Sequence, residues 1–146
     1  MGAEFPAFVG NNGATSASLR DMLRFGQLYL DKGKNLAGEQ IVSEQWITVS
    51  TVPDQPRLMP GADNPASSSH HGYKHLWWVP VEPRGDFVAL GIYGQFIYVD
   101  PSSDVVIAKT SAYQNETVDG GWKLQQTVAL LQQTALAIAS DPRLVV

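Results

Sequence analysis

The sequence contains no cysteine. This absence excludes disulfide bonds, thiolate metal sites and a cysteine nucleophile, although it does not fix the cellular compartment. Charged residues are also few, at 16% of the 146 residues, and the ten lysines and arginines form no basic run. With a net charge of −4, the chain lacks the basic face that is typical of nucleic-acid-binding domains.

Long apolar segments are missing as well. No stretch reaches the roughly 18 residues that a membrane-spanning helix needs. Met1–Gly10 has neither the basic start nor the apolar block of a signal peptide. The sequence therefore predicts no membrane partner, and the lack of a signal peptide favours the cytoplasm. A hydrophobic content of 44% is enough for a single domain, residues 1–146, with a core of its own.

Three helices are predicted from apolar positions at helical spacing. The first begins at a capping box headed by Ser18 and stops at Gly33. The second begins at the cap candidate Ser43 and ends at Pro53. The third spans roughly Gly121–Ser140 and has one apolar face.

Strand signals occupy the segment between the second and third helices, after a Pro/Ser-rich loop at residues 52–72. A loop of that length is either a functional lid or a plain surface loop. The strand signals are Tyr73–Pro80, Phe87–Leu90, Gln95–Val99 and Val105–Ala108. We therefore expect an α+β fold, with an antiparallel sheet of about three strands packed against the C-terminal helix.

Two of these strands, Phe96–Val99 and Val105–Ala108, are apolar at every position. Strands of this kind are usually covered on both faces, and the C-terminal helix covers only one. The second layer comes either from the first helix or from protein outside this sheet, such as a complementary N-terminal segment or a second copy of the chain. The sequence leaves both alternatives open.

Three segments, taken in order, resemble the C-terminal region of the class C β-lactamase-like and penicillin-binding-protein-like serine hydrolases. They are Gly13–Ile47, Gly72–Val79 and Phe87–Tyr113. The third contains the run GIYGQFIYVDP followed by VVIAK, which is similar to the 6-aminohexanoate-oligomer hydrolase branch. The resemblance implies part of a serine β-lactamase/transpeptidase-like fold and a small-molecule amide or ester substrate.

The nucleophile motif of that family is absent. The family uses the serine of an S-x-x-K motif, activated by its lysine and by the tyrosine of a Y-x-N motif, to form an acyl-enzyme. No serine in this chain has a lysine three residues later. The strings Lys109-Thr110-Ser111 and Tyr113-Gln114-Asn115 look like family motifs but lie too late in the chain, so we assign neither. We expect the chain to be inactive alone.

The position of the family's K-T-G motif corresponds to Ala89-Leu90-Gly91. The motif lysine helps to bind a substrate carboxylate, and its loss favours a neutral amide or ester over a β-lactam. By resemblance, Ile92 supplies an oxyanion-hole amide, because the family's donor is the residue after the motif glycine. Gly91 and Gly94 suit close approach of a substrate, although glycines here could instead make a strand bulge.

Further residues complete the expected site. Tyr93, Gly94 and Gln95 are expected to border the substrate, and one of the two tryptophans, Trp77, to line the cleft. The histidines at 70, 71 and 75 have metal-like spacing, but no acid or thiolate cluster accompanies them, so we predict no metal and no cofactor.

Three functions remain open at this stage. The first is a C-terminal piece of a serine hydrolase that provides the oxyanion amide and a cleft wall. The second is a non-catalytic domain that binds a partner or self-associates through leftover apolar surface. The third is a small enzyme that uses other residues, such as His75 with Asp86.

Overall fold

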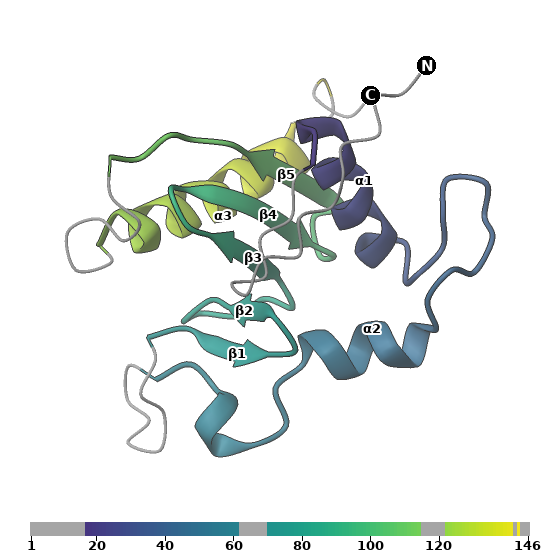
Figure 1. Cartoon of the computed structure of the whole chain (residues 1–146), viewed down its shortest axis with the longest axis horizontal. Helices are drawn as coiled ribbons and strands as arrows, with labels where there is room; N and C mark the ends of the chain where they lie inside the picture. The colour runs from purple at the N-terminus through teal and green to yellow at the C-terminus, as the bar shows by residue number, and fades with distance from the viewer. Residues whose placement is uncertain (1–16, 62–69, 115–121, 142, 144–146) are drawn as a thin grey trace.

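A five-stranded antiparallel sheet, with the strand order β1-β2-β3-β4-β5, forms the centre of the structure (Figure 1). The computed structural model describes residues 17–61, 70–114, 122–141 and 143. Its elements are α1 (Leu19–Leu30), α2 (Glu44–Thr51), the 3₁₀ helix η1 (Pro56–Leu58), β1 (Gly72–Lys74), β2 (Trp77–Val79), β3 (Phe87–Gly91), β4 (Gln95–Asp100), β5 (Val105–Lys109) and α3 (Trp122–Ser140). The predicted α+β class is confirmed, with five strands where about three were expected.

The helix starts follow from local sequence. The Ser18 hydroxyl accepts a hydrogen bond from the Asp21 N–H at 3.2 Å and donates one to the Asp21 carboxylate at 2.6 Å. Ser43 caps α2 in the same way through the Trp46 N–H, at 3.1 Å. These side chains satisfy amide groups that a helix N-terminus leaves without partners. After α1, Gly33 has a φ of 86°, which glycine adopts easily.

The segment predicted as one strand over Tyr73–Pro80 is two strands. β1 and β2 form a hairpin in which Tyr73 faces Trp78, and His75 and Leu76 make the turn with φ values of 46° and 75°. Left-handed backbone at two residues that are neither glycine nor asparagine is uncommon, so the sequence carried no turn signal there.

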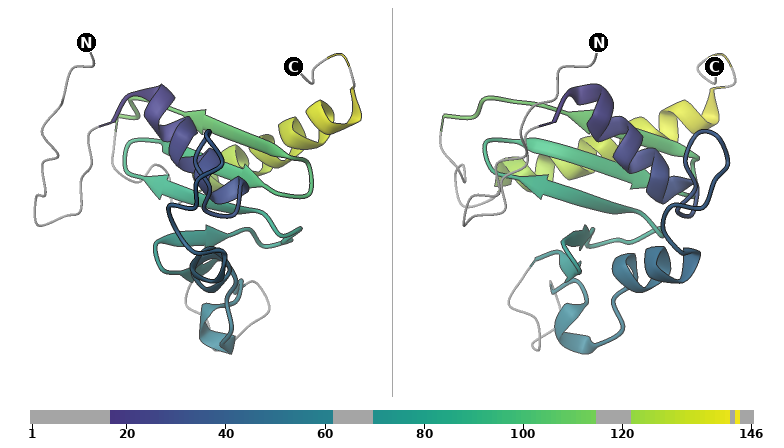
Figure 2. Two further views of the ribbon diagram at one scale, coloured as in Figure 1. Left: turned by 90° about the vertical axis from the view of Figure 1, so that its right-hand side faces the viewer. Right: turned by 45° about the vertical axis from the view of Figure 1, so that its right-hand side comes forward.

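Two layers of helix cover the sheet on opposite faces (Figure 2). On one face, α1 lies on β4 and β5. The close approach depends on Gly26, because a Cβ there would lie 2.5 Å from Val106 Cγ1 and 2.9 Å from Ile97 Cγ2. The first helix therefore supplies the second layer over the two fully apolar strands, as one of the two sequence alternatives proposed.

The other face packs on α3, around Phe96, Tyr98, Val128 and Leu131. A buried carboxylate, Asp86, ties this layer together.

Asp86 is 1% exposed and accepts hydrogen bonds from Tyr98 at 2.8 Å and from Gln132 of α3 at 2.9 Å. The backbone N–H of Arg84 donates a third, at 2.8 Å. Because each donor meets a carboxylate oxygen, the charge is buried without loss of partners.

The Pro/Ser-rich loop at 52–72 is partly regular. It contains η1, and Gly72 already belongs to β1. Its first part is anchored by Lys74, whose Nζ lies 3.0 Å from the Asp54 carboxylate and donates to the Val52 carbonyl at 3.1 Å. Residues 62–69 lie outside the described residues. Among the described helices, none is long and apolar enough to cross a membrane.

Candidate active site

The residues singled out from the family resemblance meet at the turn between β3 and β4. Gly91, the last residue of β3, pairs with Gln95, the first residue of β4. The three residues between them, Ile92–Gly94, are called here the β3–β4 turn. Gly91 therefore directly precedes a hairpin turn and Gly94 is its last residue, so neither glycine makes a bulge within a strand.

The backbone of this turn is unusual. Tyr93 and Gly94 have φ values of 59° and 81°. Consecutive left-handed residues are typical of tight hairpin turns, but a tyrosine in that region costs free energy. Non-glycine residues held in such conformations often lie at functional sites.

The amide of Ile92 is free to donate a hydrogen bond. It has no hydrogen-bond partner among the residues that the structure describes, and Ile92 is 58% exposed. A turn N–H that the described residues do not use as a donor can stabilise negative charge on a substrate oxygen.

The two glycines beside this amide are needed for different reasons. A Cβ at Gly94 would lie 2.5 Å from the ring of Tyr113, and the positive φ adds to the strain, so the fold itself requires glycine there. A Cβ at Gly91 would lie 3.0 Å from Gln95 Cβ, and its φ is not left-handed. The fold therefore requires glycine at 91 less strictly than at 94.

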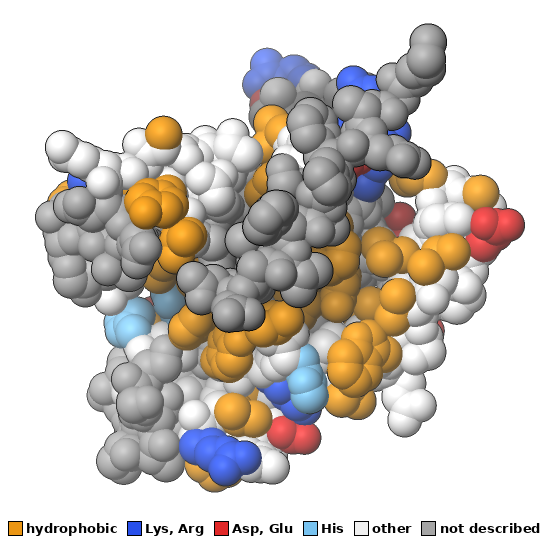
Figure 3. Space-filling view, in the orientation of Figure 1, with side chains coloured by type: hydrophobic (Ala, Val, Ile, Leu, Met, Phe, Trp, Pro, Cys, Tyr) orange, Lys and Arg blue, Asp and Glu red, His pale blue; other side chains and the backbone are white. Residues whose placement is uncertain are grey.

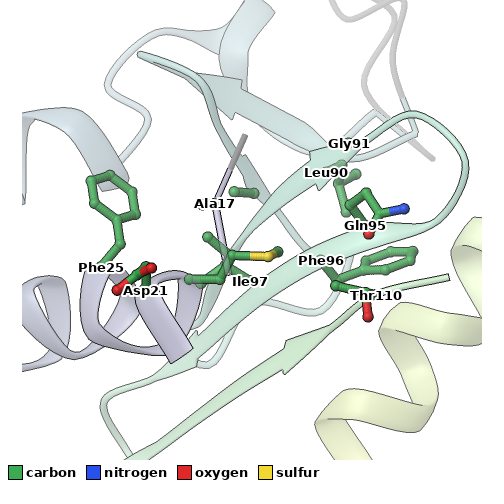
Figure 4. Close-up of a pocket in the computed structure, with 11 residues that line it drawn as sticks. Ala17, Asp21, Phe25, Leu90, Gly91, Gln95, Phe96, Ile97 and Thr110 are labelled. Carbon is green, nitrogen blue, oxygen red and sulfur yellow. The ribbon is translucent and has the colours of Figure 1, made fainter. Parts of the chain in front are cut away.

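A largely apolar pocket of about 720 Å³ lies beside the turn, between the N-terminal half of α1 and strands β3 and β4 (Figure 4). Gly91 and Gln95 line one part of it, and α1 contributes Phe25 and Asp21. The other lining residues are Ala17, Met22, Ala89, Leu90, Phe96, Ile97 and Thr110. Asp21 is the sole charged side chain among the described residues that line it, and no lysine or arginine is present to bind a carboxylate.

Apolar side chains continue outside the pocket. Leu23 and Phe25 of α1 and Trp46 of α2 are exposed, and hydrophobic side chains gather on the face shown in Figure 3, near α1, α2 and the sheet. Sequence reasoning missed the contribution of α1 to this region, because it depends on how the helix docks on the sheet.

Trp77 does not line the pocket. It is 3% exposed and belongs to an aromatic cluster with Phe25, Tyr29 and Phe87, whose ring centroids lie 4.6–6.1 Å from its own. Its burial leaves little surface for a substrate, so a binding role for Trp77 stays a prediction without support from its position. The neighbouring Trp78 faces the other side of the sheet and packs on the α3-side core.

Residues of the two short motifs that we left unassigned, which begin at Lys109 and Tyr113, lie close together in the structure. The Lys109 ammonium donates hydrogen bonds to the Ser111 hydroxyl and, at 3.3 Å, to the Tyr113 hydroxyl. The Tyr113 hydroxyl also lies 3.3 Å from Thr127 Oγ1 of α3. The signal that could have found this cluster is the spacing of two residues, which places alternate side chains of an extended segment on one side. Asn115 lies outside the described residues.

No group of three or more potential metal ligands is found in the part of the chain that the structure describes. The His75 ring lies tilted against Trp46, with ring centroids 5.2 Å apart, whereas Asp86 is buried under α3. No hydrogen bond or ion pair joins His75 to Asp86.

Comparison with known proteins agrees with the sequence resemblance. Over 125 residues, the chain is 29% identical to 6-aminohexanoate-dimer hydrolase from Paenarthrobacter ureafaciens. The chain is similar to part of a hydrolase. The aligned region covers 86% of this chain but 32% of that enzyme, so the chain spans about a third of the length of the curated relative it matches. No family model matches the chain.

Proposed function

We propose that this chain forms the oxyanion side of the active site of a serine hydrolase that cleaves neutral amide or ester bonds. The observation that carries the proposal is the amide of Ile92, a residue 58% exposed whose N–H has no hydrogen-bond partner among the described residues, in a turn whose flanking residues line an apolar pocket. The similarity to a hydrolase over most of the chain supports it.

The chemistry assigns different tasks to different parts of such a site. A serine hydroxyl attacks the substrate carbonyl carbon, and the carbonyl oxygen becomes an oxyanion that accepts the hydrogen bond of the Ile92 N–H. Since the chain has no S-x-x-K motif, the attacking serine and its activating lysine come from residues outside this sequence. We therefore expect no turnover by the 146 residues alone.

The pocket supports the choice of a neutral substrate. Its lining is mainly aliphatic and aromatic, with Asp21 the one charged group among the described lining residues. A carboxylate placed there would lose its water without gaining a cation. An uncharged acyl or amine portion buries apolar surface instead, at about 25 cal/mol per Å².

The test uses a hybrid enzyme in which this chain replaces the aligned region of the Paenarthrobacter hydrolase, assayed on that enzyme's own dimer substrate and on a nitrophenyl ester. Ile92→Pro removes the amide hydrogen, but proline also fixes φ at about −65° and restricts the residue before it, so the urea midpoints of this hybrid and of the Ile92→Ala hybrid are compared as well. Ile92→Ala keeps the amide and removes an exposed side chain. Loss of an oxyanion donor lowers kcat about 10²- to 10³-fold.

The two variants separate the candidate functions. The proposal expects Ile92→Pro to lose activity and Ile92→Ala to keep most of it, with equal stability. Equal activity of the two variants would exclude the oxyanion role. A non-catalytic binding domain would use the same apolar surface but would give a hybrid without turnover, whatever residue stands at position 92.

A further inference from the structure

The β3–β4 turn needs support from outside itself. Its conformation is strained at Tyr93, and the Ile92 amide makes no hydrogen bond to described residues that would fix its direction. An oxyanion donor contributes to catalysis only when its direction is set before the reaction. The segment that follows β5 provides the contacts that could do this.

Hydrogen bonds join that segment to the turn and to Gln95, the residue after it. The Tyr113 N–H donates to the Tyr93 carbonyl at 3.2 Å. The Gln95 side-chain amide donates to the Ser111 carbonyl at 2.5 Å and to the same Tyr93 carbonyl at 3.4 Å. Residues 111–113 therefore hold the turn at the Tyr93 carbonyl, directly and through Gln95.

The ring of Tyr113 further limits the movement of the turn. It lies so close to Gly94 that a Cβ there would be 2.5–2.7 Å from three of its carbons. The peptide at Gly94 thus lies against a flat aromatic wall. A shift of the turn toward that wall is blocked by van der Waals repulsion.

The wall itself is fixed to the rest of the fold. The Tyr113 hydroxyl is hydrogen-bonded to Thr127 of α3 and to Lys109 of β5, each at 3.3 Å. The Lys109 ammonium also lies 4.9 Å from the centre of the Tyr113 ring and 5.2 Å from that of Phe96, a distance at which a cation and a ring attract. The hydrogen bond between Tyr113 and Thr127, together with the one from Lys109, lowers the pKa of the Tyr113 phenol from its ordinary value.

From these contacts we infer that Tyr113 is a positioning residue that holds the β3–β4 turn in the conformation presenting the Ile92 amide to substrate. The catalytic consequence of this inference rests on the proposed function, whereas the structural consequence does not. Tyr113 touches the turn and not the reacting atoms, and Lys109 and Ser111 serve as its supports.

The structural part is tested on the 146-residue chain by the ¹⁵N heteronuclear NOE of the Ile92 and Gly94 amides, which reports backbone motion on the picosecond to nanosecond timescale. Tyr113→Ala removes the wall and should lower both values. Tyr113→Phe keeps the ring and should restore them, although it lacks the hydroxyl. If the alanine variant unfolds, Tyr113→Leu removes the flat ring with less loss of apolar volume.

Tyr73→Ala is the matched control, since Tyr73 is another partly buried tyrosine, packed on Trp78 in the β1–β2 hairpin. It should leave the turn amides unchanged even where it lowers the urea midpoint. Unchanged NOE values in Tyr113→Ala, or an equal decrease in Tyr73→Ala, would overturn the inference.

The catalytic part is read in the hybrid enzyme. Misplacing an oxyanion donor affects the transition state more than the bound substrate, so Tyr113→Ala should lower kcat roughly 10- to 100-fold with a smaller change in KM. Tyr113→Phe should recover most of kcat. A mobile turn together with unchanged kcat would contradict the catalytic consequence alone, whereas equal activity of the proline and alanine variants at position 92 would contradict the proposed function.

Discussion

His71 should make the stability of this fold depend on pH in a narrow, mildly acidic range. It lies directly before β1, is 6% exposed, and neither ring nitrogen has a hydrogen-bond partner among the described residues. Burial, followed by the charge of His70, lowers its pKa from 6.5 to about 4. The folded protein therefore holds this imidazole neutral in a range where the unfolded chain protonates it.

The sign follows from which state binds the proton. Between pH 6.5 and about 4, the unfolded state takes up a proton that the folded state refuses, so stability is full above pH 6.5 and decreases as the pH falls. At about 1.4 kcal/mol per pH unit, the loss reaches at most about 3 kcal/mol near pH 4. That is a large share of the 5–15 kcal/mol that stabilises a typical domain.

Urea unfolding followed by tryptophan fluorescence at pH 7.5, 6.5, 5.5 and 4.5 measures this slope. His71→Leu removes the titrating group and the two ring nitrogens that have no partner among the described residues. It should flatten the profile and leave stability at pH 7.5 equal or higher, by about 1 kcal/mol. His70→Gln, at an exposed position, should keep the slope. A slope that survives in His71→Leu would refute the assignment to His71.

Three further predictions concern the packing around the site, each read as the free energy of unfolding in urea. Gly26→Ala should destabilise the fold by about 1–2 kcal/mol, because overpacking costs more than the gain in helix propensity. Adding Val106→Ala should recover part of that loss. A stabilising effect of Gly26→Ala would contradict the close contact between helix and sheet. Tyr93→Asn should stabilise by about 0.5–1 kcal/mol, since asparagine tolerates the left-handed φ of 59° better; a loss of stability would mean that the tyrosine ring contributes more than its backbone costs. Asp86→Asn should cost about 2–3 kcal/mol, because an amide cannot accept from Tyr98 and the other donors together; a neutral result would mean that these three hydrogen bonds contribute little to stability.

The parts of the fold that were predictable are those with local causes. Ser18 and Ser43 are capping residues, and their hydrogen bonds to nearby amides set the helix starts. The apolar strands β4 and β5 were found from composition, because strands covered on both faces carry apolar residues at successive positions. The β1–β2 hairpin was missed because its turn residues, His75 and Leu76, lack turn propensity and are held there by the strands they join.

The candidate site also has a part that was predictable from the sequence and a part that was not. The Gly91–Gln95 run was recognised from its resemblance to a family. The pocket was not, because Phe25 and Asp21 reach β3 only through the docking of α1, which Gly26 permits. Tyr113 was set aside because a three-letter string has many accidental matches. Its importance lies in a contact with Gly94 that depends on the path of the chain after β5.

The central claim is that these residues supply the oxyanion amide of a hydrolase and not its nucleophile. The chain alone should be incubated with a fluorophosphonate and, separately, with a nitrophenyl ester, and its intact mass then measured. The account predicts an unchanged mass. Among the serines of this chain, Ser111 is the one whose labelling we would test first, because its hydroxyl contacts the Lys109 ammonium and Tyr113 lies beside it. Stoichiometric addition that maps to Ser111, and disappears in Ser111→Ala, would contradict the account.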